Sequence, residues 1–137
     1  MNKTTFLILS LLILINCKKE ESISEMIPDG TYKGTFQREI VWSSGSNISN
    51  ITLTFSSDQW SGTSDKEKYP ALCHGTYSIN RDTIIFENEC AWTAEFDWSL
   101  ILAGKYILKQ SGNTFEFSRD YRSSTSDTYI DKFRILK

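Results

Sequence analysis

The side chains best suited to chemistry gather in the stretch CAWTAEFDWSLILAG, residues 90–104, and just before it. Carboxylates and aromatic rings alternate there: Glu87, Glu89, Glu95 and Asp97 with Trp92, Phe96 and Trp98. Paired carboxylates between aromatic rings are typical of glycosidase sites. Glu87 and Glu89 lie two residues apart, however, so on a strand they share the face opposite Phe86, which indicates a solvated surface. We therefore expect no glycosidase activity from this cluster.

A serine hydrolase is also disfavoured. Its catalytic triad would have to use His74, the only histidine of the chain, and no Gly-x-Ser-x-Gly elbow is present. We expect no catalytic residues, and the protein is predicted not to be an enzyme.

Cys73, His74 and Cys90 could instead form a disulfide, a thiol nucleophile or a metal site. Zinc sites usually show paired ligands at close spacing, but the chain has no Cys-x-x-Cys pair. If Cys17, near the start of the chain, has a separate role, Cys73 and Cys90 remain as an even pair, which favours a disulfide between them. It would close a loop of about 17 residues and stabilise the fold by roughly 3 kcal/mol. We expect no metal and no cofactor.

Trp92, Phe96 and Trp98 allow two interpretations. They could cap one end of the domain and pack beside the disulfide, or they could form a binding rim, because exposed aromatic patches mark interaction sites. We name these three residues as the candidate ligand contacts. A strand is favoured for about 96–102, and the pattern also allows a short helical turn just before it, at 91–95.

The start of the chain explains Cys17. Lys3 precedes an apolar run from Phe6 to Ile15, which is shorter than the ~20 residues that span a bilayer. A run of this kind after a positive residue is typical of a secretory signal. The residues Leu14-Ile15-Asn16-Cys17 resemble the lipobox of bacterial lipoproteins, which implies that Cys17 is acylated and becomes the first mature residue.

The charged residues that follow, Lys18-Lys19-Glu20-Glu21, resemble the signal that sends some Bacteroidetes lipoproteins to the outer face of the outer membrane. They could equally be a solvated tether. We predict a signal peptide at 1–16, a lipidated flexible tether at 17–28 and one folded domain at 29–137. The implied location is the outer membrane, with the membrane as a partner through the lipid anchor.

Charge excludes a nucleic-acid partner. The formal net charge is −2, and basic residues form no run or stripe.

The folded region alternates with a period of two. Tyr32, Gly34 and Phe36 fall on one face of GTYKGTFQR, and Ile51, Leu53 and Phe55 fall on one face of the next run. Short polar links at 56–59, 80–82 and 111–113 separate such runs and predict hairpins. Longer loops are expected at 42–50 and 122–127. The pattern predicts an all-β, antiparallel up-and-down barrel of about eight or nine strands, closed without free edges.

The opening DGTYKGTF resembles the first strand of lipocalins, and residues 29–137 are similar to small lipocalin-like domains of Bacteroidetes lipoproteins. The resemblance implies a membrane-anchored envelope lipoprotein that binds a small apolar or glycan ligand in the barrel mouth.

The alternative is a protein-interaction module with a solid barrel, either an accessory subunit of an envelope complex or an enzyme inhibitor acting through a loop such as 42–50. A lined cavity would favour the first function. An interior packed with five aromatic residues would favour the second: Tyr32, Phe36, Phe55, Phe86 and Phe117.

Overall fold

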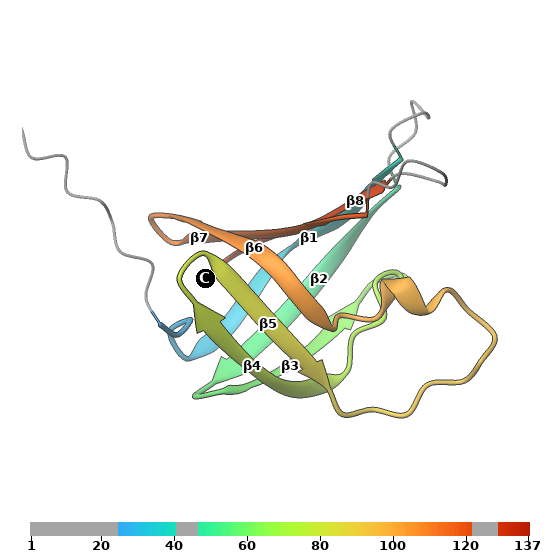
Figure 1. Cartoon of the computed structure of the whole chain (residues 1–137), viewed down its shortest axis with the longest axis horizontal. Coiled ribbons are helices and arrows are strands. Elements are labelled where there is room, and N and C mark those ends of the chain that lie inside the picture. Colours follow the sequence, from blue (N-terminus) through green and yellow to red (C-terminus); the bar gives the residue numbers. More distant parts are fainter. Residues whose placement is uncertain (1–24, 41–46, 122–128) are drawn as a thin grey trace, which may run out of the picture.

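The computed structural model describes residues 25–40, 47–121 and 129–137 and forms a closed antiparallel β-barrel (Figure 1). The strands follow one another in chain order: β1 (Gly30–Ile40), β2 (Asn47–Ser56), β3 (Gln59–Ser64), β4 (His74–Asn80), β5 (Thr83–Asn88), β6 (Gly104–Ser111), β7 (Thr114–Asp120) and β8 (Tyr129–Leu136). A 3-10 turn, η1 (Trp98–Leu100), interrupts the connection between β5 and β6. The predicted fold class is confirmed, with eight strands.

Strand β1 closes the barrel by pairing with two neighbours. Phe36, for example, lies opposite Ser49 of β2 and opposite Phe133 of β8. Closure leaves no unpaired sheet edge among these strands, so the barrel offers no template for strand addition.

Aromatic rings fill the barrel interior. The five residues predicted to point inward are each at most 1% exposed: Tyr32, Phe36, Phe55, Phe86 and Phe117. Ring contacts that pass through Tyr77 and Phe133 join them into one cluster, in which Phe117 stacks on Phe133 with ring centroids 4.7 Å apart. Ring pairs at such distances contribute beyond the area that they bury. Alternation along the strands therefore identified the core correctly.

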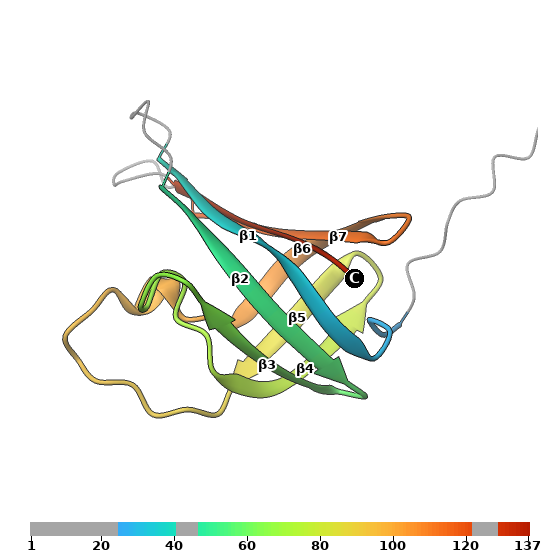
Figure 2. The same ribbon diagram turned by 180° about the vertical axis from the view of Figure 1, so that it is seen from behind.

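The N-terminal end of the barrel is closed by the residues before β1. Ile27 is buried, and its backbone N–H donates to the hydroxyl of Tyr77 at 3.1 Å. The Tyr32 hydroxyl donates to the carbonyl of Pro28, and Lys137 Nζ donates to the carbonyl of Asp29. The short turns β2–β3, β4–β5 and β6–β7 lie at this end, together with the C-terminus (Figure 2).

The opposite end, which we call the loop end, carries the connections 65–73 and 89–103. Here the structure corrects three predictions. Residues 96–102 do not form a strand, because the Asp97 carboxylate accepts the Ser99 N–H and starts η1 instead. Residues 91–95 form no helical turn. Residues 47–50, expected to lie in a loop, belong to β2.

The hairpin turns at 56–59, 80–82 and 111–113 are confirmed. Several predictions concern residues outside the described ranges: the signal peptide at 1–16, acylated Cys17, the tether up to residue 24, the first part of the loop at 42–50 (residues 42–46) and the loop at 122–127. Within the described ranges, no helix has the length and apolar character needed to cross a bilayer.

Candidate binding surface at the loop end

Residues 89–103 form a long segment that crosses the loop end and projects beyond it (Figures 1 and 2). We call this segment the lid. Its first residues are bound to the barrel by the Cys73–Cys90 disulfide, which confirms that predicted pair. Its last residues pair with Ala71, whose N–H donates to the carbonyl of Leu100 and whose carbonyl accepts the N–H of Leu102. The lid is therefore held at both of its ends.

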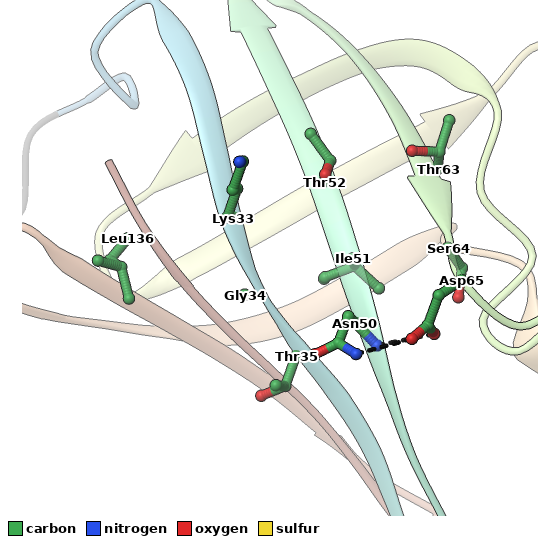
Figure 3. Close-up of a pocket in the computed structure, with 10 residues that line it drawn as sticks. All are labelled: Lys33, Gly34, Thr35, Asn50, Ile51, Thr52, Thr63, Ser64, Asp65 and Leu136. Atoms are coloured by element: carbon green, nitrogen blue, oxygen red, sulfur yellow. Dashed lines mark hydrogen bonds between the residues drawn. The ribbon is translucent and has the colours of Figure 1, made fainter.

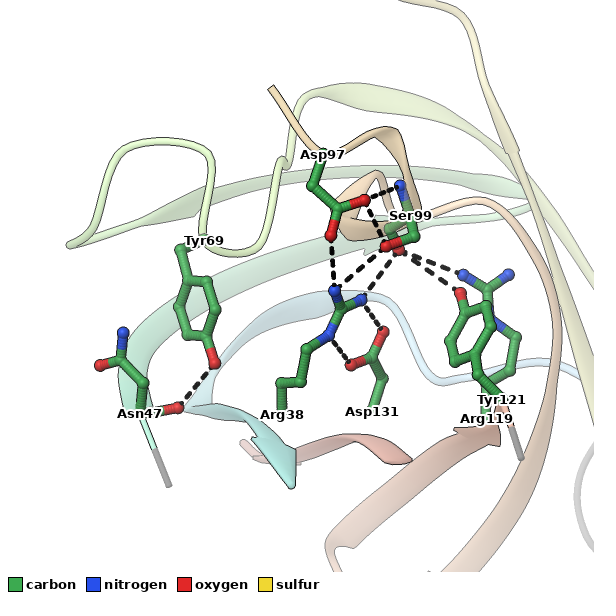
Figure 4. Close-up of polar contacts among 8 residues, drawn as sticks. All are labelled: Arg38, Asn47, Tyr69, Asp97, Ser99, Arg119, Tyr121 and Asp131. Carbon is green, nitrogen blue, oxygen red and sulfur yellow. Dashed lines mark hydrogen bonds and ion pairs between the residues drawn. The ribbon is translucent and has the colours of Figure 1, made fainter. Parts of the chain in front are cut away.

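Arg38 holds the middle of the lid (Figure 4). Its Nε and Nη2 donate to the two carboxylate oxygens of Asp131 at 2.6 and 2.7 Å. Its Nη1 donates to Asp97 Oδ2 at 2.9 Å and to Ser99 Oγ at 3.0 Å. One guanidinium thus joins a residue of the barrel wall to the two lid residues that begin η1.

The position of Arg38 follows from strand parity. Tyr32, Gly34 and Phe36 precede it on the inward face of β1, and Arg38 is the next inward residue, at the height where the aromatic core ends. Asp131 lies directly opposite it on β8. Arg38 and Asp131 are only 8% and 1% exposed, so both charges are buried and depend on each other.

The charges of this network shift the pKa values of its members. Burial disfavours the charge of Arg38, but the hydrogen bonds and charge of Asp131 outweigh burial and raise its pKa. Burial alone would raise the pKa of Asp97, but the hydrogen bonds from Ser99 and the charge of Arg38 lower it below its ordinary value. Both shifts favour the ionised pair, so the contact between lid and barrel is fully charged at neutral pH.

A second guanidinium supports the end of the lid. Arg119 Nη1 donates to the carbonyl of Ala103 at 2.7 Å, and its Nη2 lies 3.5 Å from the carbonyl of Ser99. The guanidinium carbon of Arg119 stands 4.6 Å from the ring centroid of Tyr106 and 4.3 Å from that of Tyr121. Two arginines and a layer of tyrosines thus fill the mouth beneath the lid.

Sequence reasoning did not single out Arg38, Asp131 or Arg119. Arg38 and Asp131 are 93 residues apart, and only the register of β1 against β8 brings them together. One signal was available: Asp131 shares the strand face of Phe133 and Ile135, where a charge requires a partner.

The three predicted contact residues lie on the lid, but in two different environments. The rings of Trp92 and Phe96 pack together at 5.5 Å, and Lys68 Nζ lies 5.1 Å from the Phe96 ring centroid. Trp92 also borders a groove of about 290 Å3 beside residues 62–72. Trp98 is separate and is 56% exposed, with its Nε1–H donated to the carbonyl of Thr93.

A second hollow lies on the outer wall of the barrel, across β1, β2 and β3 (Figure 3). It has a volume of about 690 Å3, and most of its lining residues are polar, with Thr35, Thr52 and Thr63 among them, although apolar atoms supply most of the exposed lining surface. Asn50 donates its backbone N–H and its side-chain amide to the two carboxylate oxygens of Asp65. No aromatic side chain lines this groove among the described residues, so it lacks the flat platform expected of a sugar site.

A scan against models of known protein families found no match for this chain, and a search of curated proteins found no similar sequence. The closed eight-stranded barrel is consistent with a lipocalin-like fold. Function must therefore be inferred from the geometry of the barrel and the lid.

Proposed function

We propose that this chain is a lipid-anchored, non-enzymatic protein-interaction module of the bacterial outer membrane, and that it contacts its partner through the lid. The filled barrel carries this proposal. An eight-stranded barrel is either filled by side chains or holds one small ligand. A ligand site requires roughly 300 Å3 or more, whereas the inward positions here are occupied by rings in contact with one another. Binding is therefore expected on the outside.

Trp98 is the best anchor for a protein partner on that outside surface. Tryptophan is enriched among the residues that dominate interface energies. More than half of this side chain is exposed, although its indole N–H is already satisfied by the lid itself. The ring is therefore held in place before binding, which reduces the entropy lost on association.

The rigidity of the lid supports the same function. The disulfide, the Ala71 backbone pairing and the Arg38 network fix it at three places. A segment held in this way presents a defined surface rather than an ensemble of conformations. Glu95 is exposed beside Phe96, so the presented surface combines aromatic rings with a carboxylate that suits a partner with basic or amide groups.

The position of the anchor is consistent with this surface. If Cys17 is acylated, the tether reaches the barrel at Ile27, at the N-terminal end. Strand β1 runs from there to Arg38 beneath the lid, and the nine residues from Gly30 to Arg38 extend about 27 Å along the strand. The lid is therefore expected to face away from the membrane, toward a partner.

Capture of a small apolar or glycan ligand by Trp92, Phe96 and Trp98 stays a prediction with less support. The mouth through which such a ligand would enter is occupied by Arg38, Asp131 and the lid residues bound to them.

Site-specific photo-crosslinking in the source cells tests the proposal. A benzophenone amino acid would replace Trp98 in one variant and Ser78, an exposed residue of β4, in a matched control. We expect a discrete protein adduct from position 98 that is absent from position 78. The same adducts at both positions, or adducts to lipid or glycan alone at position 98, would overturn the proposal.

A further inference from the structure

We propose that reduction of the Cys73–Cys90 disulfide converts the base of the lid into a zinc site with Cys73, His74 and Cys90 as protein ligands. The two sulfur atoms and a ring nitrogen of His74 all lie within 4.8 Å of one another. In a tetrahedral zinc site, with Zn–S near 2.3 Å and Zn–N near 2.0 Å, donor atoms are about 3.5–3.8 Å apart. The three groups therefore need only small side-chain movements to surround one ion.

The backbone keeps these residues together without the disulfide. Glu89 donates its backbone N–H to the carbonyl of His74 at 3.0 Å, one residue away from each cysteine. Gly75 pairs with Asn88 in the ladder between β4 and β5. The N–H of Cys90 is fixed by the side chain of Asn88, and the carbonyl of Cys73 by the N–H of Gly62. Reduction would therefore leave the two thiols facing one another.

Glu89 is placed to orient the histidine. Its Oε2 lies 3.8 Å from His74 Nδ1. Histidine ligands commonly give one ring N–H to a carboxylate and bind the metal through the other nitrogen. A small side-chain rotation would bring the Glu89 carboxylate within hydrogen-bond distance of that ring nitrogen, so that the other nitrogen could bind the ion. His74 is exposed, so water can supply the fourth ligand, as in sites with three protein ligands.

The chemistry balances with a two-electron reductant. A dithiol reduces the disulfide to two cysteine thiols and is itself oxidised to a disulfide. Zinc then displaces one proton from each thiol as two Zn–S bonds form, so two protons are released for each ion bound. Because thiolates are the binding form, affinity rises with pH. The lid would thus be joined to β4 by a covalent bond in the oxidised state and by zinc in the reduced state.

Cobalt binding to the full chain tests this site. A Cys17→Ser background leaves Cys73 and Cys90 as the only thiols, and a phosphine reductant opens the disulfide without competing for metal. One equivalent of Co²⁺ should produce thiolate-to-cobalt absorption in the near ultraviolet, and Zn²⁺ should abolish it. The oxidised protein should show no such band.

Two variants and a stability measurement complete the test. His74→Ala should weaken metal binding at least tenfold, and Glu89→Gln should weaken it by a smaller factor. Zn²⁺ should raise the melting temperature of the reduced protein and leave that of the oxidised protein unchanged. The proposal is overturned if the reduced protein gives no cobalt band, if His74→Ala binds as tightly as the parent, or if the reduced protein is unfolded and Zn²⁺ does not restore its structure.

Discussion

Replacing Arg38 by methionine should destabilise the barrel strongly. Methionine keeps much of the length of the side chain but leaves Asp131, which is 1% exposed, without the two hydrogen bonds that it receives at 2.6 and 2.7 Å. Breaking a buried ion pair by removing one partner costs about 3–5 kcal/mol. With a urea m-value of about 1.5 kcal/mol/M, the unfolding midpoint should fall by about 2–3 M.

A second ion pair on the same two strands provides a matched control. Lys132 Nζ contacts Glu39 Oε1 at 3.0 Å across β8 and β1, but the two side chains are 35% and 39% exposed. Because exposed ion pairs contribute at most about 1 kcal/mol, Glu39→Gln should shift the midpoint little. Arg38→Met combined with Asp131→Leu should recover most of the loss, because the buried charge is then removed together with its partner.

The effect should also depend on pH in a defined direction. Burial raises the pKa of Asp131, and Arg38 opposes that rise. Without Arg38 the folded-state pKa of Asp131 rises further above its unfolded value, so protonation on folding favours the native state at low pH. The deficit of Arg38→Met should therefore shrink as the pH falls from neutral toward the ordinary carboxyl pKa of 3.8. This account of the network would be refuted if the free energy of unfolding of Arg38→Met lay within 1 kcal/mol of that of the parent protein. It would also be refuted if the difference between the two did not change with pH.

Four further outcomes are expected. Phe117→Ala should lower the free energy of unfolding by about 3–5 kcal/mol in urea titrations, because the ring is fully buried and stacked on Phe133. Replacing Cys73 and Cys90 together by serine should cost roughly 3 kcal/mol in the same assay under oxidising conditions. Because the pKa of Asp97 is lowered, its contact with Arg38 is complete above its ordinary value of 3.8 and is lost as pH falls through the lower folded-state value, which a shift in tryptophan emission should report. Cys17→Ser should move the protein from the membrane fraction to the soluble or unprocessed fraction, and continued membrane binding would contradict acylation at that residue.

The barrel could be predicted because its signals are local. Alternation places Tyr32 and Phe36 on the inward face whatever strand lies beside β1, and short polar turns mark the hairpins. The disulfide could be predicted once Cys17 was assigned to the lipid anchor, because only two cysteines then remained. Local signals suffice for features that depend on neighbours in sequence or on composition.

The lid could not be predicted in the same way. Residues 96–102 fit both a strand and a helix pattern, and the outcome is decided by contacts from elsewhere in the chain. Arg38 from β1 and Ala71 from the β3–β4 connection fix the path of this segment. The buried Arg38–Asp131 pair depends on the register of the first strand against the last, which no local pattern specifies. Its residue type marked Trp98 as a candidate contact, but the sequence did not indicate that Trp98 would be more exposed than Trp92.

The central claim is that the barrel is solid and that recognition takes place outside it. A titration of the oxidised protein with an apolar fluorescent probe such as N-phenyl-1-naphthylamine tests this claim most directly. Phe117→Ala, titrated with benzene in place of the dye, serves as the positive control if it stays folded, because a cavity made by removing a buried ring can take up a molecule of that size. We expect no saturable dye emission from the parent protein, and a rise in melting temperature with benzene for the variant but not for the parent. Saturable one-to-one binding to the parent protein would contradict the claim and restore a ligand site within the barrel.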